Sequence, residues 1–152
     1  MGRATYLADP QGAAVALFRD LKGDMTGFDP SRAVVGEFCW ETLNTSDPDG
    51  AVRFYTAVAG QHASEFQGGR MLATGPRPED GVADVEQAPP GVPPHWLSHV
   101  VIDDLAASRD RATRLGAQVL MAEIDVPTVG KMAVIRDPVG AFLSLFQAAP
   151  RG

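Results

Sequence analysis

The chain has 152 residues, of which 45% are hydrophobic and 21% are charged, and its formal net charge of −6 comes from 13 basic and 19 acidic side chains. This length is enough for one domain with a buried core, and the composition is that of an ordinary globular protein. The acidic balance argues against a nucleic-acid partner, because phosphate binding requires a basic surface.

The first predicted element is a β-hairpin at residues 2–19, and the same unit returns at residues 130–147. In each copy two apolar runs flank an Asp-Pro-x-Gly turn, in which proline fixes φ, aspartate caps the turn and glycine tolerates a positive φ. Aligned without gaps, the copies are identical at Gly2/Gly130, Asp9/Asp137, Pro10/Pro138, Gly12/Gly140, Ala13/Ala141, Leu17/Leu145 and Phe18/Phe146. These identities indicate internal repetition.

The repeat predicts how the chain is divided. We expect residues 1–20 to be the orphan closing hairpin of a preceding or degenerate module, residues 21–35 to be a linker, and residues 36–148 to be a complete domain. The strands of the orphan hairpin carry apolar residues on both faces, as at Tyr6 and Leu17, and such a hairpin is not stable alone. We therefore expect it to dock on a sheet edge, either in its own domain or on a second subunit. The second case makes the protein a homodimer.

The complete domain begins with a predicted strand at residues 36–45, which is rich in aromatic and β-branched residues. Ser46-Asp47-Pro48 is typical of a helix start, with a capping side chain and a proline in the first turn. Apolar residues follow at helical spacing, and Gly60 is expected to end the helix. Short strands are expected near residues 62–66, 70–74 and 82–86.

The same order restarts after residues 76–94, which are rich in proline, glycine and acid and are predicted to be mostly loop. There Glu79, Asp80, Asp84 and Glu86 are expected to form a solvated loop face. The restart consists of a strand at 95–102, a helix capped by Asp103-Asp104 and closed by Gly116, a strand at 117–121 and the hairpin at 130–147. Two successive β-α-β-β-β units predict an α+β fold: paired βαβββ modules forming a curved mixed sheet, with helices outside and a cup inside.

These residues carry a family resemblance. The strand–Asp–helix run at residues 37–55, Val-Val-Ile-Asp-Asp-Leu at residues 100–105 and the Asp-Pro-Val-Gly-Ala hairpin resemble the glyoxalase/bleomycin-resistance/extradiol-dioxygenase (vicinal oxygen chelate) superfamily. Trp96, Leu115-Gly116-Ala117 and Val129-Gly130-Lys131 resemble its two-domain actinobacterial members, which are often labelled hydroxylases or glyoxalases. The resemblance implies the glyoxalase-like fold. It implies no particular reaction, because this fold hosts lyases, epimerases, dioxygenases and drug-binding proteins.

The resemblance also implies a divalent metal, held by ligands on the first and last strands of each unit and open to substrate. The matching positions in this chain are Trp40, Leu97, Ser144 and, in the orphan hairpin, Ala16. Tryptophan and leucine cannot coordinate a divalent cation, and a neutral serine is a poor ligand. We therefore predict no metal site and no cofactor.

An alternative ligand set remains open. A one-residue bulge in the first strand would turn Glu41 inward, where it could join His95 and His99. Two histidines four residues apart on a strand are about 13 Å apart, which is too far for one ion. The metal-free interpretation is therefore favoured.

Strand alternation places a set of side chains on the cup-facing side. The predicted ligand-binding residues are Trp40, Thr42, His95, Leu97, His99, Phe142 and Ser144. Phe38, Val101 and Phe146 share that side and are expected to fill the core. An apolar lining with a few polar groups is typical of a small-molecule site. Trp40 offers a stacking surface, while Thr42, His99 and Ser144 offer hydrogen bonds.

We therefore expect a protein that binds a small apolar or aromatic molecule in the cup. No catalytic residue is identifiable, so whether the protein is an enzyme stays open. Two alternatives remain: a metal-dependent lyase or dioxygenase with displaced ligands, and a degenerate structural domain. The lone cysteine, Cys39, is expected in the core. A lone cysteine fits a reducing compartment, and the sequence has no apolar run long enough to span a membrane and no signal peptide. We therefore predict a cytoplasmic protein without a membrane partner.

Overall fold

The computed structural model describes residues 2–21, 34–77 and 80–150. The linker predicted at residues 21–35 lies almost entirely outside this range. The chain divides into two compact units, one made of residues 1–28 and 41–96, the other of residues 29–40 and 97–152. The division into hairpin, linker and complete domain stays a prediction.

The first unit contains the N-terminal hairpin and one β-α-β-β-β module. Its elements are β1 (Gly2–Ala8), β2 (Ala14–Asp20), β3 (Phe38–Thr45, from Glu41 onward), α1 (Pro48–Ala59), β4 (His62–Phe66), β5 (Gly69–Ala73) and β6 (Gly81–Gln87). Strand β6 pairs in parallel with β3 and antiparallel with β5, which pairs antiparallel with β4. The module is therefore a mixed sheet with one helix.

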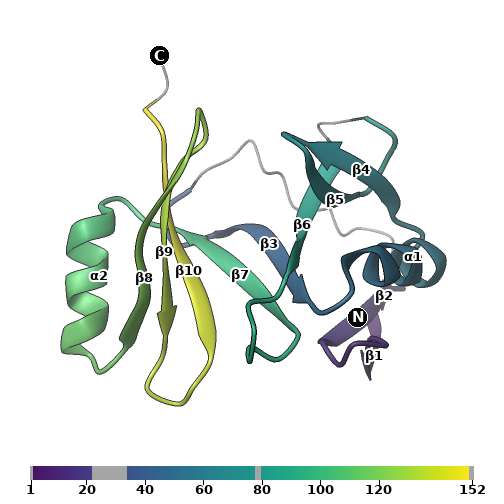
Figure 1. Ribbon diagram of the computed structural model, residues 1–152, viewed down its shortest axis with the longest axis horizontal. Coiled ribbons are helices and arrows are strands. Elements are labelled where there is room, and N and C mark those ends of the chain that lie inside the picture. The colour runs from purple at the N-terminus through teal and green to yellow at the C-terminus, as the bar shows by residue number, and fades with distance from the viewer. Residues whose placement is uncertain (1, 22–33, 78–79, 151–152) are drawn as a thin grey trace. The chain divides into compact units, whose positions relative to one another are not determined.

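The second unit repeats this arrangement. Its elements are β7 (His95–Val101, from Leu97 onward), α2 (Leu105–Arg114), β8 (Gln118–Val126), β9 (Gly130–Arg136) and β10 (Phe142–Ala148). Strand β10 pairs in parallel with β7 and antiparallel with β9, and β9 pairs antiparallel with β8. Figure 1 shows α2 alongside the sheet of β8, β9 and β10. The predicted α+β fold of βαβββ modules is confirmed.

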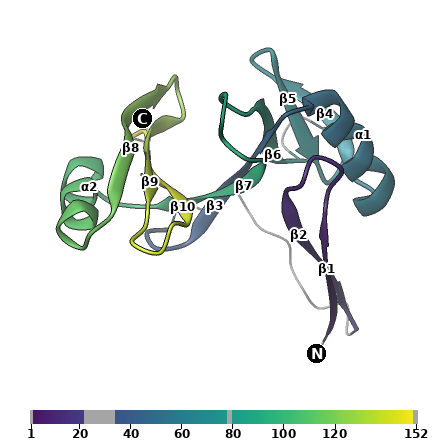
Figure 2. The same ribbon diagram turned by 60° about the horizontal axis from the view of Figure 1, so that its bottom comes forward.

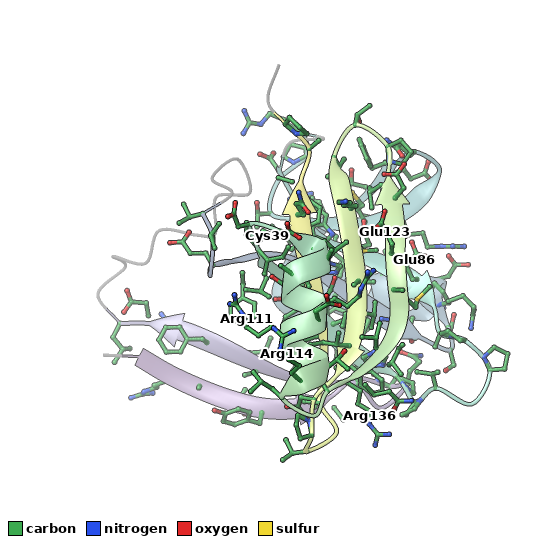
Figure 3. The ribbon with its side chains drawn as sticks, turned by 90° about the vertical axis from the view of Figure 1, so that its left-hand side faces the viewer. Cys39, Glu86, Arg111, Arg114, Glu123 and Arg136 are labelled. Atoms are coloured by element: carbon green, nitrogen blue, oxygen red, sulfur yellow. The ribbon has the colours of Figure 1, made fainter. Side chains whose placement is uncertain are left out.

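Both helices begin as the sequence predicts. Asp47 Oδ1 accepts a hydrogen bond from the Gly50 N–H at 2.9 Å, and Asp104 Oδ1 accepts one from the Ala107 N–H at 2.9 Å. Gly60, with φ of 67°, ends α1. Figure 3 looks onto α2, whose last turn carries Arg111 and Arg114. Their positive charges interact favourably with the negative end of the helix dipole. Neither described helix is long and apolar enough to cross a membrane.

Each helix covers one face of its own sheet. The cluster that joins α1 to its sheet and to the hairpin consists of Ala13, Leu43, Ala51, Tyr55, Leu72, Ala83 and Val85. The cluster under α2 consists of Leu105, Ala133, Ile135 and Leu145. Because side chains alternate along a strand, the residues between these positions point to the face away from the helix. Most of the predicted ligand-binding residues lie on this face away from the helix.

One strand is longer than predicted. The segment expected to end at residue 121 continues to Val126 as β8. Two register shifts, after Val119 and after Met121, let this edge strand stay paired with β9 although its own pattern is irregular.

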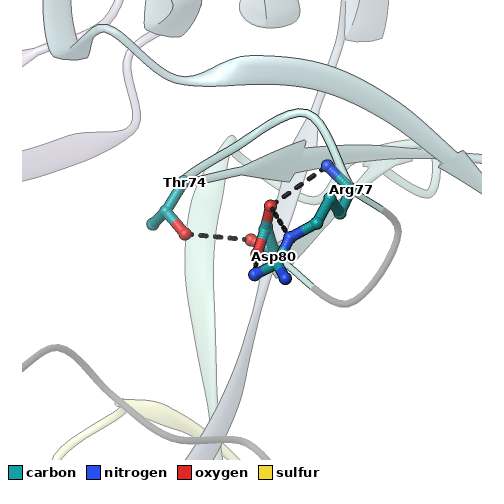
Figure 4. A network of polar contacts seen from close by, with 3 residues as sticks. All are labelled: Thr74, Arg77 and Asp80. Carbon is teal, nitrogen blue, oxygen red and sulfur yellow. Dashed lines mark hydrogen bonds and ion pairs between the residues drawn. The ribbon is translucent and has the colours of Figure 1, made fainter.

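The acidic residues expected in one solvated loop face lie in different settings. Asp84 and Glu86 belong to β6, which forms where a strand was expected near residues 82–86, so these two residues do not form a loop face. Glu79 lies outside the described residues. Asp80 closes the turn before β6 (Figure 4). Its carboxylate accepts hydrogen bonds from the Arg77 N–H at 3.0 Å, Nε at 3.1 Å and Nη2 at 2.6 Å, and its carbonyl accepts one from the Thr74 hydroxyl at 3.2 Å. These bonds from Arg77 lower the pKa of Asp80 below its usual value.

The two copies of the repeated turn have the same backbone hydrogen bonds. In both, the aspartate N–H donates to the alanine carbonyl four residues later, at 2.9 Å in the first copy and 2.8 Å in the second. The glycine N–H donates to the aspartate carbonyl at 3.0 Å in each. Both glycines have a positive φ, 107° for Gly12 and 103° for Gly140, which would strain any side chain. The sequence repeat is therefore also a structural repeat.

The first turn is held by a buried carboxylate. Asp9 is 4% exposed, and its Oδ1 accepts hydrogen bonds from three N–H groups of its own turn, between 2.8 and 3.0 Å. Its Oδ2 accepts one from the Tyr55 hydroxyl of α1 at 3.1 Å, and Trp96 Nε1 donates to that hydroxyl at 3.2 Å. Burial raises the pKa of Tyr55 to about 12, so the hydroxyl keeps the proton that it donates to Asp9.

The turn is thus the part of the hairpin that docks, which corrects the expectation of docking on a sheet edge within the chain. Strands β1 and β2 form a sheet of their own and share no ladder with the other described strands. Figure 2 shows the hairpin turn near α1 and the arms extending away from it. On these arms Tyr6 is 84% and Phe18 54% exposed. Docking of the hairpin on a second subunit stays a prediction.

We expect Asp9→Ala to lower the free energy of unfolding by about 1–3 kcal/mol more than Asp137→Ala, because only Asp9 adds a buried bond to Tyr55 to the bonds of its turn. Chemical denaturation of the two variants measures the difference. The losses from Asp9→Ala and Tyr55→Phe should also be less than additive, since both remove the same bond. Equal losses at the two turns would show that the Tyr55 bond contributes nothing measurable.

Candidate small-molecule site

The candidate site is the face of the second unit's sheet that points away from α2. Val100 of β7 and Leu145 of β10 pack toward α2. Their strand neighbours His99 and Ser144 therefore point to the other face. In the sheet register Ser144 lies beside His99 on one side and Val134 on the other. Since neighbouring strands are about 4.8 Å apart, a hydroxyl and an imidazole lie side by side.

His99 is almost completely enclosed, with 4% of its surface exposed. Burial disfavours the charged imidazolium and lowers the pKa of His99 to about 4. At neutral pH the ring is therefore uncharged, with one nitrogen that donates a hydrogen bond and one that accepts. Such a group can recognise a polar atom without presenting a charge to it.

Ser144 is fully buried, and its Oγ has no hydrogen-bond partner among the described residues. Leaving a buried hydroxyl unpaired costs about 1–3 kcal/mol. Most buried polar side chains in folded proteins are paired, so this exception requires a physical reason. A molecule bound at this face would supply one.

The structure gathers four of the seven predicted ligand-binding residues on this face, namely Leu97, His99, Phe142 and Ser144. Leu97 is 7% exposed, and Phe142 is half-buried. Trp40 is half-buried at the end of the β3 segment that belongs to the same unit. The apolar residues and the two uncharged polar groups are therefore close neighbours.

The other two predicted residues belong to the first unit. Thr42 is 9% exposed on the face away from α1, beside Asp84 in the sheet register. His95 is half-buried at the start of β7, where its Nδ1 lies 2.9 Å from the Pro93 carbonyl oxygen. The cup expected between the modules stays a prediction.

Sequence reasoning missed Val134 beside Ser144 and Asp84 beside Thr42. Val134 could have been found, because the turn between β9 and β10 fixes the register of the hairpin. Asp84 lies in the strand expected near residues 82–86, but its place beside Thr42 depends on the parallel pairing of β6 with β3, which no local pattern reveals. Phe38, which was expected in the core, is 57% exposed, and that expectation is wrong.

A separate hollow of about 640 Å³ lies in the first unit, lined by Asp49, Val52, Arg53, Ala63, Ser64, Glu65 and Arg70. Its rim carries an exposed ion pair in which Arg70 Nε lies 2.6 Å from Asp49 Oδ1. Exposed pairs of this kind contribute little to stability. None of the predicted ligand-binding residues lines the hollow, and we assign no role to it.

The residues present do not fit a divalent metal. Of the strand positions matched to metal ligands in the two modules, only Ser144 carries an oxygen atom, and that oxygen is neutral. Among the residues that the structure describes, no group of three or more His, Cys, Asp or Glu side chains is arranged to hold an ion. The displaced set combines Glu41 and His95 of the first unit with His99 of the second, and it stays a prediction.

A family model described as a glyoxalase-like domain matches residues 40–146. The match extends from β3 to β10 and thus includes both β-α-β-β-β modules. The chain belongs to the glyoxalase-like domain family. This confirms the resemblance that the helix-capping runs and the Asp-Pro-Val-Gly hairpin carry.

Curated relatives of this glyoxalase-like chain are longer than the chain. "Putative glyoxylase CFP32" of Mycobacterium bovis is 36% identical over 158 residues, which cover 99% of this chain and 58% of the relative. "Anthracycline biosynthesis protein DauV" of Streptomyces sp. (strain C5) is 33% identical over 153 residues, which cover 97% of this chain and 53% of the relative. The chain therefore spans little more than half the length of these curated relatives.

A solved structure supports the fold. The Mn(II)-bound glyoxalase from Novosphingobium aromaticivorans superposes with a TM-score of 0.53 at 19% identity, over 78% of this chain and 42% of that protein. At this identity the likeness shows the glyoxalase-like α+β fold, and a shared fold does not determine a shared reaction.

The burial of His99 makes the stability of this glyoxalase-like domain depend on pH. The His99 pKa is about 4 in the folded chain and 6.5 in its ordinary state, so the unfolded chain binds more protons between these values. We expect the free energy of unfolding to fall as the pH is lowered from about 6.5 to about 4, by up to about 3 kcal/mol from this residue. Denaturation of the wild type and of His99→Gln across this range isolates the contribution.

His62→Gln, which removes an exposed histidine at the start of β4, is the matched control. The pH dependence should flatten in His99→Gln and not in the control. If the wild type and His99→Gln lose stability in parallel, then His99 is not the buried group responsible.

Proposed function

We propose that this glyoxalase-like domain binds a small apolar or aromatic molecule at the face of β7, β9 and β10 that points away from α2, without a metal ion. The observation that carries the proposal is the setting of His99 and Ser144, two buried and uncharged polar side chains on adjacent strands. Leu97, Val134 and Phe142 supply apolar surroundings. Small-molecule sites commonly combine an apolar lining with a few placed polar groups.

The comparisons support an aromatic ligand. The Streptomyces relative is named for anthracycline biosynthesis, and anthracyclines are polycyclic aromatic compounds. The family fold serves many reactions and therefore favours none of them. The proposal is accordingly one of binding, and it assigns no reaction.

Titration calorimetry with naphthalene and 1-naphthol tests the proposal. We expect binding of at least one probe, and we expect Phe142→Ala to weaken it by about tenfold, because losing contact with a phenyl ring costs on the order of 1–2 kcal/mol. Phe66→Ala is the matched control, since it removes the same side chain from an exposed position on β4. The control should bind like the wild type.

Elemental analysis of the same samples, with and without added Mn²⁺, Zn²⁺, Fe²⁺ and Ni²⁺, separates the proposal from the metal-dependent lyase or dioxygenase. We expect no stoichiometric metal. A near-stoichiometric divalent ion would reject the metal-free proposal. Failure of both aromatic probes to bind the wild type would favour a structural role.

We also propose that the chain is a cytoplasmic homodimer, with the hairpin arms at the interface. The exposed apolar side chains of Tyr6 and Phe18 support an interface there, because two strands bearing them are not stable on their own. Light scattering should give twice the chain mass for the full protein and the single chain mass after deletion of residues 1–30. If the full-length protein is already a monomer and the deletion leaves it a monomer, the proposed dimer is refuted.

A further inference from the structure

The buried hydroxyl of Ser144 points to the chemistry of the ligand. Its Oγ has no partner among the described residues, and its cross-strand neighbours are His99 and Val134. A serine hydroxyl can donate one hydrogen bond and accept two. An alanine would fill nearly the same space without a group that loses its hydrogen bonds to water on folding. Position 144 therefore carries a group that folding alone disfavours.

The neighbours of Ser144 select against a charged ligand. It is flanked by His99 and Val134 across the sheet and, on the same face of its own strand, by Phe142 and Phe146. None of these side chains carries a charge at neutral pH, because His99 is 4% exposed and its imidazole is neutral. A carboxylate or an ammonium group placed here would lose its hydration without gaining an opposite charge.

The same neighbours favour a flat apolar ring. Phe142 and Phe146 lie two residues before and after Ser144, about 7 Å away in each direction along the strand. Phenyl rings contact aromatic ligands favourably in offset-stacked or edge-to-face arrangements. Since Ser144 is fully buried, a molecule reaches its hydroxyl only after neighbouring side chains move aside, and the bound molecule is then enclosed by protein. The requirement is therefore an aromatic body with a single neutral polar atom directed at β10.

We propose that Ser144 and His99 together recognise a neutral oxygen atom, a carbonyl or a hydroxyl, borne by an aromatic ring. The inference deepens the proposed function and rests on it. Ser144 donates to a ligand carbonyl or accepts from a ligand hydroxyl, and the imidazole on the adjacent strand borders the same oxygen. Where the family resemblance implies a metal ligand, this chain thus has an uncharged hydrogen-bonding group.

Three probes that share one ring system test the inference: naphthalene, 1-naphthol and 1-naphthoate. At neutral pH we expect the wild type to bind 1-naphthol about tenfold more tightly than naphthalene, the effect of one buried hydrogen bond, and to bind 1-naphthoate more weakly than 1-naphthol. In Ser144→Ala the advantage of 1-naphthol over naphthalene should disappear. Titration calorimetry measures all six affinities.

Ser98→Ala is the matched control, because it makes the same change on β7 at a position that alternates with His99 and shares the α2 side with Val100. This variant should keep the full advantage of 1-naphthol. Thermal unfolding gives a second readout: Ser144→Ala should be at least as stable as the wild type, since it removes an unpaired buried group. A clearly lower melting temperature would show that the hydroxyl is paired within the protein and would overturn the inference.

The outcomes distinguish this inference from the proposed function. If the wild type binds naphthalene and 1-naphthol equally well, the inference is wrong and the proposed function stands. If neither probe binds, both are wrong. If Ser144→Ala retains the preference for 1-naphthol, the hydroxyl holds an ordered water only and the inference is overturned.

Discussion

The parallel pairing of the first and last strands of each module is the constraint on which the rest of the structure depends. Parallel strands cannot be joined by a tight turn, so a longer crossover must lie between them, and in each module it consists of a helix and two further strands. In the second module this pairing sets Ser144 of β10 beside His99 of β7. The intervening helix covers one face of the sheet and excludes water from Leu145. One register thus determines both the core under α2 and the pair of polar residues on the opposite face.

The repeated hairpin shows that similar sequences can have different surroundings in the folded chain. The two Asp-Pro-x-Gly turns, which differ only at the third position, have the same backbone bonds. Leu145 of β10 is buried because β7 and α2 contact it, whereas its counterpart Leu17 of β2 is only half-buried on a sheet of two strands. Among the described residues, the first turn gains a bond from outside the hairpin, from Tyr55 to Asp9, and the second turn does not. The same type of turn therefore docks the hairpin against α1 at residues 9–12 and merely connects two paired strands at residues 137–140.

Local signals predicted most of the fold because they act within a few residues. Caps at Asp47 and Asp104, the glycine after α1 and the Asp-Pro-x-Gly turns each constrain the backbone at one point. The errors come from non-local causes. Strand β8, for example, is extended by its pairing with β9. Propensity alone carries no information about such partners.

The candidate site divides in the same way. Alternation along β7 and β10 was sufficient to place Leu97, His99, Phe142 and Ser144 on one face. It could not reveal that His99 is uncharged or that the Ser144 hydroxyl is unpaired, since both depend on what encloses them. The Asp9–Tyr55 bond was equally out of reach, because it joins two segments with no common periodicity.

Burial explains both unusual properties of the His99–Ser144 pair. Exclusion of water lowers the pKa of the imidazole, and it makes an unpaired hydroxyl costly. The same low local dielectric strengthens any hydrogen bond that a ligand makes there. It also disfavours a divalent cation, for which this face offers no charged ligand. At the positions where the family resemblance implies metal ligands, Leu97 and Ser144 carry no charged group, and the proposed ligand of this face is accordingly a neutral oxygen atom. Stability and recognition oppose each other at position 144, as they commonly do where a protein keeps a polar group ready for a partner.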